Sequence, residues 1–147
     1  MKKVFVTNDN IKNYLFEILR QLHATSFKPD VVVGLVRGGC VPANFVSQFY
    51  DISCFMINKD TKQLDFTQYN NVLVIDDIND TGKALTETDF MLLGHRNNIK
   101  YAALISNEGS SFNVDYCGKL INKIQDPCWI VFPWENWWQL VPEEVYC

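Results

Sequence analysis

The stretch NVLVIDDINDTGKALTE, residues 71–87, decides how the rest of the chain is organised. It opens with the apolar run Val72 to Ile75, which predicts a strand buried on both faces, as in a parallel sheet. Asp76 and Asp77 end this run, and Asp80 begins a turn that leads into a helical pattern. The stretch therefore predicts a strand, a turn and a helix, with three acids where the strand meets the turn.

The expected start of this helix, around Thr81 to Leu85, indicates an anion-binding site. The first turn of a helix leaves backbone N–H groups unpaired and carries the positive end of the helix dipole. The carboxyl edge of parallel strands is also where open α/β sheets bind their ligands. Carboxylates and an anion-binding turn would thus lie side by side. This arrangement suits a ligand with a phosphate at one end and hydroxyls or a metal at the other, such as a sugar phosphate.

Other nucleotide-binding patterns fit this stretch less well. A Walker A loop needs two glycines and a dinucleotide fingerprint needs three, whereas Gly82 is the only glycine here. A phosphorylatable aspartate at the strand end stays open, although it would not explain the Thr81-Gly82 turn. Asp80 and Thr81 could also simply cap the helix, with the acid pair in solvent, because both residue types are common caps.

Length and composition bound the class of protein. A chain of 147 residues with 48% hydrophobic residues is expected to be one domain, residues 1–147, with a core of its own. The formal net charge of −4 argues against a nucleic-acid partner, so a polyanionic ligand would need local donors and a divalent cation. The five cysteines show no C-x-x-C pair and no metal-ligand spacing, which favours reduced, mostly buried thiols in a cytoplasmic protein. Neither a signal-peptide pattern nor a long apolar span is present, so we expect no membrane partner.

Apolar runs outside residues 71–87 predict further elements. Strands are expected at Val4–Val6, Val31–Leu35, Ile52–Ile57 and Tyr101–Ile105, with a short edge strand at Val114–Tyr116. Helical spacing is found from Ile11 to Leu22, with Asn8 or Asp9 as the cap, and from Phe45 to Tyr50. Gly94 would close the helix that begins near Thr81.

A second motif, VRGGCVP at residues 36–42, follows the expected strand Val31–Leu35. The adjacent glycines Gly38 and Gly39 let successive backbone N–H groups point at one spot, and Arg37 adds a fork of donors. Such a loop could hold a pyrophosphate. A plain strand-to-helix turn, with Pro42 near the helix start, is the alternative.

The third informative segment is DPCWIVFPWE, residues 126–135, because all four tryptophans of the chain lie between Trp129 and Trp138. Trp134, Trp137 and Trp138 are expected to form an apolar cover or a subunit contact. An aromatic face can also stack on a flat base, although stacking alone does not tell one base from another.

These three motifs resemble those of type I phosphoribosyltransferases, in the order in which that family has them. VLVIDDINDTGKAL is similar to the family signature that binds phosphoribosyl pyrophosphate (PRPP). The Arg-Gly-Gly of residues 37–39 resembles the pyrophosphate loop of the purine phosphoribosyltransferases. The W-I-x-x-P-W-acid pattern that begins at Trp129 resembles the base-binding hood of the xanthine–guanine enzymes, in which the first tryptophan stacks on the purine.

The resemblance implies an α/β fold, an open parallel sheet flanked by helices, with a small C-terminal hood formed mainly by about residues 107–147. It implies an enzyme, a pentosyltransferase of nucleotide salvage. The reaction would transfer the phosphoribosyl group of PRPP to a 6-oxopurine (guanine, hypoxanthine or xanthine) and release pyrophosphate, with Mg²⁺ as cofactor. We expect a homo-oligomer whose ligands are PRPP and a purine base.

The resemblance also assigns roles to residues of this chain. Asp76 and Asp77 would hold the ribose of PRPP and the metal, and Asp80 would be the catalytic acid or base. The 5′-phosphate would be bound by Asp80, Thr81, Gly82, Lys83 and Ala84, the pyrophosphate by Arg37, Gly38 and Gly39, and the base by Trp129, Ile130 and Asn107. The peptide bond between Val36 and Arg37 would be cis.

Three positions depart from the family pattern. Ala84 stands where relatives usually offer a hydroxyl to the phosphate, and Lys83 replaces a small residue. Lys83 could compensate with its charge or point into solvent. Asn107 stands where relatives that take 6-oxopurines have a lysine that donates to O6 of the base. An asparagine amide can donate or accept, so it would discriminate weakly between an O6 acceptor and an N6 donor.

Two other functions stay open at this point. The chain could be a non-catalytic regulator of the same fold that senses PRPP, although Asp80 and Trp129 favour an enzyme. It could also be a phosphoribosyltransferase for another base, such as a pyrimidine, although the hood sequence argues against that. In the family a mobile lid covers the active site in the interval that matches Asn58–Tyr69. That interval is short here, so it would be a reduced lid or an ordinary hairpin loop.

Overall fold

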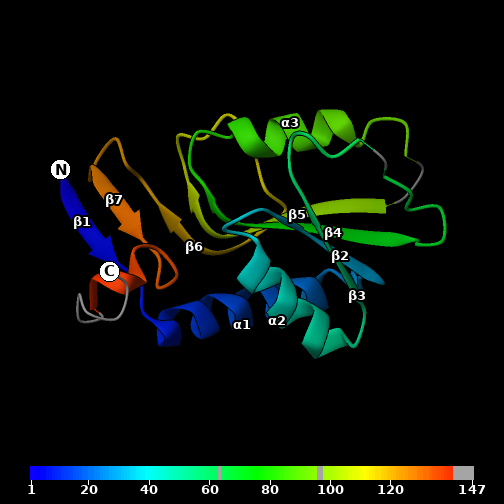
Figure 1. Cartoon of the computed structure of the whole chain (residues 1–147), viewed down its shortest axis with the longest axis horizontal. Helices are drawn as coiled ribbons and strands as arrows, with labels where there is room; N and C mark the ends of the chain where they lie inside the picture. Colours follow the sequence, from blue (N-terminus) through cyan, green and yellow to red (C-terminus); the bar gives the residue numbers. More distant parts are fainter. Residues whose placement is uncertain (63, 96–97, 141–147) are drawn as a thin grey trace.

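A computed structural model describes residues 1–62, 64–95 and 98–140, and it contains two separate parallel sheets (Figure 1). The elements in chain order are β1 (Lys2–Phe5), α1 (Asn8–Ala24), β2 (Val31–Leu35), α2 (Cys40–Tyr50), β3 (Ser53–Ile57), β4 (Asn71–Asn79), α3 (Lys83–Met91), β5 (Asn98–Asn107), β6 (Tyr116–Ile121), β7 (Cys128–Val131) and the 3₁₀ helix η1 (Trp137–Leu140). The larger sheet has five parallel strands in the order β3-β2-β4-β5-β6. Helices flank this sheet, which confirms the predicted fold class.

The central strands of the five-stranded sheet are buried on both faces, as the apolar run Val72 to Ile75 predicted for β4. α1 and α2 lie on one face and α3 lies on the other (Figure 1). Successive side chains of a strand point to opposite faces. Leu73 and Ile75 accordingly belong to the core cluster that includes residues of α1 and α2, whereas Val72 and Val74 belong to the cluster of α3. The sheet therefore separates two cores and holds β4 at its centre.

The start of α1 is stabilised by a capping box that the sequence analysis did not identify. Thr7 Oγ1 accepts a hydrogen bond from the backbone N–H of Asn10 at 3.0 Å, and Asn10 Oδ1 accepts one from Thr7 N at 3.0 Å. The prediction that Asn8 or Asp9 caps this helix was wrong. Thr7 is preferred because a residue three positions later can return its hydrogen bond, which satisfies two backbone donors at once.

Several element ends also differ from the predicted ones. β4 does not stop at the acids but continues to Asn79, because Asp76, Ile78 and Asn79 pair with β5. The helix α3 ends at Met91 with Leu92 as its cap, and Gly94 adopts a positive φ of 93° two residues later. The predicted edge strand is present as β6, but it begins only at Tyr116.

The segment from Asn58 to Tyr69 is not a hairpin loop. β3 and β4 are not neighbours, because β2 lies between them, so the segment crosses over to the far side of β2. Phe66 anchors the crossover: it is 2% exposed and lies in the core cluster of α3. Gln63 lies outside the described residues. Whether the segment also works as a lid stays a prediction.

The second sheet joins the N-terminal strand to a strand in the last fifth of the chain. β1 pairs in parallel with β7, with Lys2 opposite Cys128 and Phe5 opposite Val131. This two-stranded sheet lies at one end of the molecule (Figure 1). It places the tryptophan-rich segment beside the N-terminal strand. The predicted hood extends to residue 147, and residues 141–147 lie outside the described residues.

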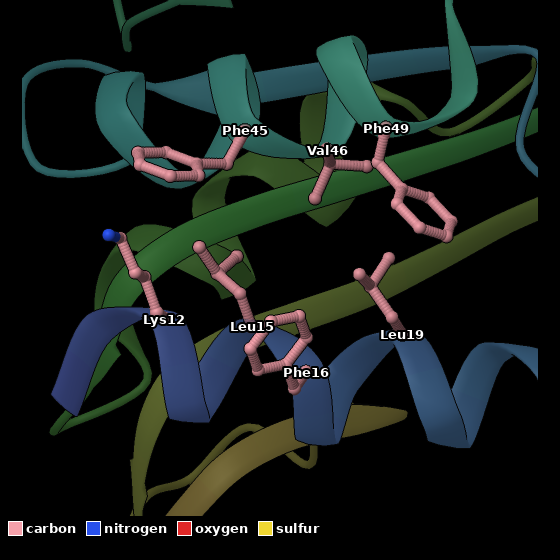
Figure 2. Close-up of a pocket in the computed structure, with 7 residues that line it drawn as sticks. All are labelled: Lys12, Leu15, Phe16, Leu19, Phe45, Val46 and Phe49. Atoms are coloured by element: carbon pink, nitrogen blue, oxygen red, sulfur yellow. The ribbon is translucent and has the colours of Figure 1, made fainter. Parts of the chain in front are cut away.

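An apolar groove lies between α1 and α2 (Figure 2). Its volume is about 200 Å³, and its lining residues are Lys12, Leu15, Phe16, Leu19, Phe45, Val46 and Phe49. Phe16 and Phe49 are 66% and 63% exposed, so the groove is bordered by apolar surface that the described chain leaves open to solvent.

None of the helices in the described part of the chain has the length and apolar character needed to span a membrane. The four cysteines described, Cys40, Cys54, Cys117 and Cys128, are free thiols, but only Cys128 is buried and the other three are half-buried, so the prediction of mostly buried thiols was wrong for this part of the chain.

Candidate active site

Two buried carboxylates lie at the carboxyl end of β4. Asp76 and Asp77 are each 9% exposed, and their carboxylates accept hydrogen bonds from the next residue in the chain: Asp77 N donates to Asp76 Oδ1 at 2.9 Å, and Ile78 N donates to Asp77 Oδ1 at 2.7 Å. Burial, and secondly the charge of Asp77, raises the pKa of Asp76 to about 8. Burial also raises the pKa of Asp77. A ligand that brings a cation or hydroxyl donors to this pair would stabilise its charged form.

The loop after β2 lies against this acid pair. The peptide bond between Val36 and Arg37 is cis, as the family resemblance implied. A Cβ atom at Gly38 would collide with the Asp77 carboxylate, so a glycine is needed for this close approach. Gly39 N donates to Leu35 O at 2.8 Å, which closes the turn into α2. The side chain of Arg37 is exposed. The loop after β2 therefore packs directly against the acid pair at Asp77.

The turn after β4 leads directly into α3. Gly82 occupies the helix cap with a φ of 91°, a conformation that favours glycine. Thr81 Oγ1 accepts from Lys83 N at 3.3 Å, but the Asp80 side chain pairs elsewhere, so Asp80 does not serve as the helix cap. A cavity of about 280 Å³ opens over this turn, lined by Ile78 to Leu85 and by Glu87. Lys83 and Ala84 are both exposed there. This is the geometry expected for an anion-binding helix start.

Hydrogen bonds from polar residues that the sequence analysis did not identify hold the turn after β4 in place. Asn79 Nδ2 donates to Ser106 Oγ at 3.0 Å and to Phe112 O at 2.8 Å. Ser110 Oγ donates to Asn79 Oδ1 at 2.8 Å, and the backbone N–H of Ser111 donates to Thr81 O at 3.0 Å. Polar residues in the loop between β5 and β6 carry no recognisable pattern, so only the fold shows that they hold the signature turn in place.

A larger cavity of about 580 Å³ lies between the glycine loop, Asp77 and three of the tryptophans. Its lining residues are Arg37, Gly38, Val41, Asp77, Trp129, Trp134, Glu135, Asn136 and Trp138. Trp129 is 56% exposed, so a large part of its ring is open to a ligand. Trp134 stacks on Phe132 with ring centroids 4.9 Å apart. The side chain of Ile130 is buried in the core instead, so it does not line this cavity.

Lys123 links Asp80 to Trp129, and no motif singled it out. Its Nζ atom lies 2.6 Å from Asp80 Oδ2 and 5.9 Å from the centroid of the Trp129 ring. Asn107 Nδ2 lies 3.3 Å from Asp80 Oδ1 and also 3.3 Å from Asp80 O. Asn107 is the last residue of β5 and not part of the following turn. A lysine in a connecting segment has no sequence signature, which explains why it was missed.

The acid pair fits a magnesium ion that is held partly by a substrate. In the described residues no group of three or more His, Cys, Asp or Glu side chains could hold a metal. Mg²⁺ is commonly bound through one or two carboxylates, with water and substrate phosphates as the other ligands. Asp76 and Asp77 are a donor set of that kind, next to a loop suited to pyrophosphate.

The family model described as the phosphoribosyl transferase domain matches residues 6–139. This chain therefore belongs to the phosphoribosyltransferase family, and the class that its fold and site define is that of phosphoribosyltransferase enzymes. A comparison with curated proteins found no match.

Solved structures of several members of this family are similar to the chain. A purine phosphoribosyltransferase from Pyrococcus horikoshii Ot3 is 32% identical, with a TM-score of 0.76, covering 92% of this chain and 95% of that one. The Helicobacter pylori xanthine-guanine-hypoxanthine phosphoribosyltransferase is 20% identical, with a TM-score of 0.80 and coverages of 94% and 95%. An orotate phosphoribosyltransferase from Aeropyrum pernix is 13% identical, with a TM-score of 0.56 and coverages of 72% and 68%. The last two similarities show the fold alone.

Proposed function

We propose that this enzyme transfers the phosphoribosyl group of PRPP to a 6-oxopurine and releases pyrophosphate. The observation that carries the proposal is the cavity of about 580 Å³, in which Arg37 and Gly38, Asp77 and Trp129 line one space. These residues come from three motifs that suit a pyrophosphate, a ribose and a flat base. A ligand that spans them would have the size and chemistry of PRPP beside a nucleobase.

Each part of the chain has a separate task in this reaction. The backbone N–H groups of Thr81 to Ala84 bind the 5′-phosphate, and Asp76 and Asp77 hold the ribose hydroxyls and Mg²⁺. Arg37, Gly38 and Gly39 bind the pyrophosphate that leaves. Catalysis then consists chiefly of positioning and of electrostatic stabilisation of the charge that develops. Mg²⁺, when bound, would neutralise charge on the leaving group.

The covalent change takes place at C1′ of the ribose. The bond from C1′ to the pyrophosphate oxygen breaks, and the electron pair leaves with pyrophosphate. A ring nitrogen of the base forms the new bond to C1′. Asp80 takes the proton that this nitrogen loses. The base is held flat against Trp129 during the transfer.

The test is a pyrophosphate-release assay with PRPP, Mg²⁺ and a panel of guanine, hypoxanthine, xanthine, adenine, orotate and uracil. We expect turnover with the 6-oxopurines. Trp129→Ala should raise KM for the base by about 5- to 100-fold, the range of base–aromatic stacking. Trp137→Ala is the matched control, because Trp137 lines a different pocket. PRPP binding without turnover on any base would favour the regulator, and turnover with orotate alone would identify a pyrimidine enzyme.

The oligomeric state and the location in the cell belong to the proposal as well. We propose a homo-oligomer in which the exposed apolar side chains around the groove of Figure 2 are covered by another copy. Sedimentation of the wild type and of Phe49→Glu tests this. A wild type that is monomeric at micromolar concentration would contradict it. A cytoplasmic location remains part of the proposal.

A further inference from the structure

The ammonium group of Lys123 lies near both the ring of Trp129 and the carboxylate of Asp80. Lys123 lies in the connection between β6 and β7, and its side chain is 18% exposed. It contacts Asp80 at 2.6 Å and lies 5.9 Å from the centre of the Trp129 ring. The proposed proton acceptor and the proposed stacking surface are therefore joined by one cation.

The backbone around Lys123 is held by hydrogen bonds on both sides. Lys123 N donates to Asn107 Oδ1 at 3.1 Å, which ties the connection to the end of β5. Asn122 Oδ1 accepts from Ile124 N and Gln125 N, each at 3.1 Å, and Asn122 Nδ2 donates to Glu108 Oε2 at 2.7 Å. These bonds hold the backbone of the connection beside β5, and the contact of the ammonium with Asp80 places the end of the Lys123 side chain.

Asn107 is a positioning residue in this arrangement and not the group that reads the base. Its Nδ2 donates to Asp80, and its Oδ1 accepts from the backbone of Lys123. Both ends of the amide are thus used within the protein. A ligand that hydrogen-bonded to Asn107 would have to break one of these contacts. The ammonium of Lys123 has three N–H donors, and its bond to Asp80 uses one of them, which leaves donors for a ligand.

We propose that Lys123 selects the base: it favours a base with a carbonyl group at the edge facing Asp80 over a base with an amino group there. This inference rests on the proposed function, since it assumes that a base stacks on Trp129. An ammonium can only donate hydrogen bonds. It stabilises a carbonyl oxygen, but an exocyclic amine would bring a second donor towards a positive charge. The site would then prefer bases with a carbonyl group over bases with an amino group by the free energy of one charged hydrogen bond.

The experiment compares hypoxanthine with adenine in the wild type and in Lys123→Met. Methionine keeps much of the apolar stem and removes the donor. We expect kcat/KM for hypoxanthine to fall by about 10- to 100-fold, the effect of losing a charged hydrogen bond, while kcat/KM for adenine changes much less. Lys123→Arg should keep the preference for hypoxanthine, because it retains a donor-only cation. Lys119→Met, which removes an exposed lysine of β6, is the control and should leave the ratio unchanged.

A second measurement covers the case in which Lys123→Met loses turnover because Asp80 loses its anchor. Calorimetric binding of the two product nucleotides, IMP and AMP, reports base preference without catalysis. The preference for IMP over AMP should shrink in Lys123→Met. It should also shrink in Lys123→Gln, because a glutamine amide can accept a hydrogen bond from the exocyclic amine of AMP. An equal loss for both bases, or an unchanged ratio of IMP to AMP binding, overturns the inference but leaves the proposed function intact. A wild type that transfers phosphoribosyl to no base overturns the proposed function and this inference with it.

Discussion

Replacing Asp76 with asparagine should make the protein more stable at pH 8 and should flatten the pH dependence of its stability. Burial, with the charge of Asp77 as the second cause, raises the pKa of Asp76 from an ordinary value of 3.8 to about 8. Between these values the unfolded chain has released the proton and the folded protein still holds it. The folded state therefore binds more protons than the unfolded state, so stability is lost as the pH rises through this window.

The size of the effect follows from the number of protons. A difference of one proton changes the free energy of unfolding by about 1.4 kcal/mol per pH unit. For a chain of this length, about 1 kcal/mol corresponds to roughly 2–4 °C in Tm. In the middle of the window the wild type should lose about 3–6 °C per pH unit relative to Asp76→Asn.

Thermal unfolding without divalent cations at pH 5, 6, 7 and 8 measures this difference. Asp60→Asn serves as the control, because it removes an exposed carboxylate and should leave the pH dependence as it is. Parallel curves for the wild type and Asp76→Asn would refute the reasoning. They would mean that the acid pair is ionised in the folded protein at all four pH values.

Three further predictions follow from the same site. Asp80→Asn should lower kcat by about 10²- to 10⁴-fold with PRPP affinity nearly unchanged, and near-normal turnover in a steady-state assay would contradict its role as proton acceptor. Gly38→Ala should abolish PRPP binding measured by calorimetry, because the new Cβ collides with the Asp77 carboxylate. Gly109→Ala, where the nearest atom would be 3.6 Å away, should bind normally, and equal affinities for the two variants would be evidence against the pyrophosphate loop. Binding of Mg²⁺ and PRPP at pH 7 should release about one proton from the acid pair, seen as a dependence of the binding enthalpy on the buffer, and no such dependence would show that the pair is already ionised.

The parts of the structure that sequence could predict are those set by neighbouring residues. β2 spans Val31–Leu35 as predicted, because a short unbroken run of apolar residues, rich in valine, is typical of a strand buried on both faces. The signature turn was also predictable, because it depends on residues that are close together in the sequence: the acids at the end of a strand and Gly82, which adopts a positive φ. The end of β4 was placed too early because the acids look like a stop signal. Pairing with β5 overrides that signal and keeps Asp76 and Asn79 in the strand.

The parts that sequence could not predict depend on contacts between distant segments. Nothing in Lys2–Phe5 indicates that this strand pairs with Cys128–Val131, because a short apolar run does not specify its partner. Asn107 was assigned to the base from its expected place after a strand, and that place does not predict its hydrogen bonds to Asp80 and to the backbone of Lys123. These hydrogen bonds depend on the path of the connection between β6 and β7, which brings Lys123 next to the end of β5.

The two ends of the proposed site differ in how they are built, and this difference bears on substrate choice. The proposed phosphate end consists of two continuous loops that would bind through backbone N–H groups, so it requires glycines and leaves a pattern in the sequence. The base end consists of the side chains of Asp80, Lys123 and Trp129, which three separate segments supply. A side chain at the base end can change without disturbing either loop. One fold can therefore serve several bases, in agreement with its presence in both purine and orotate phosphoribosyltransferases. On this reasoning the base preference of the chain is set by the contacts of Lys123 and Trp129, and exchanges at these two positions should change the base while PRPP binding is kept.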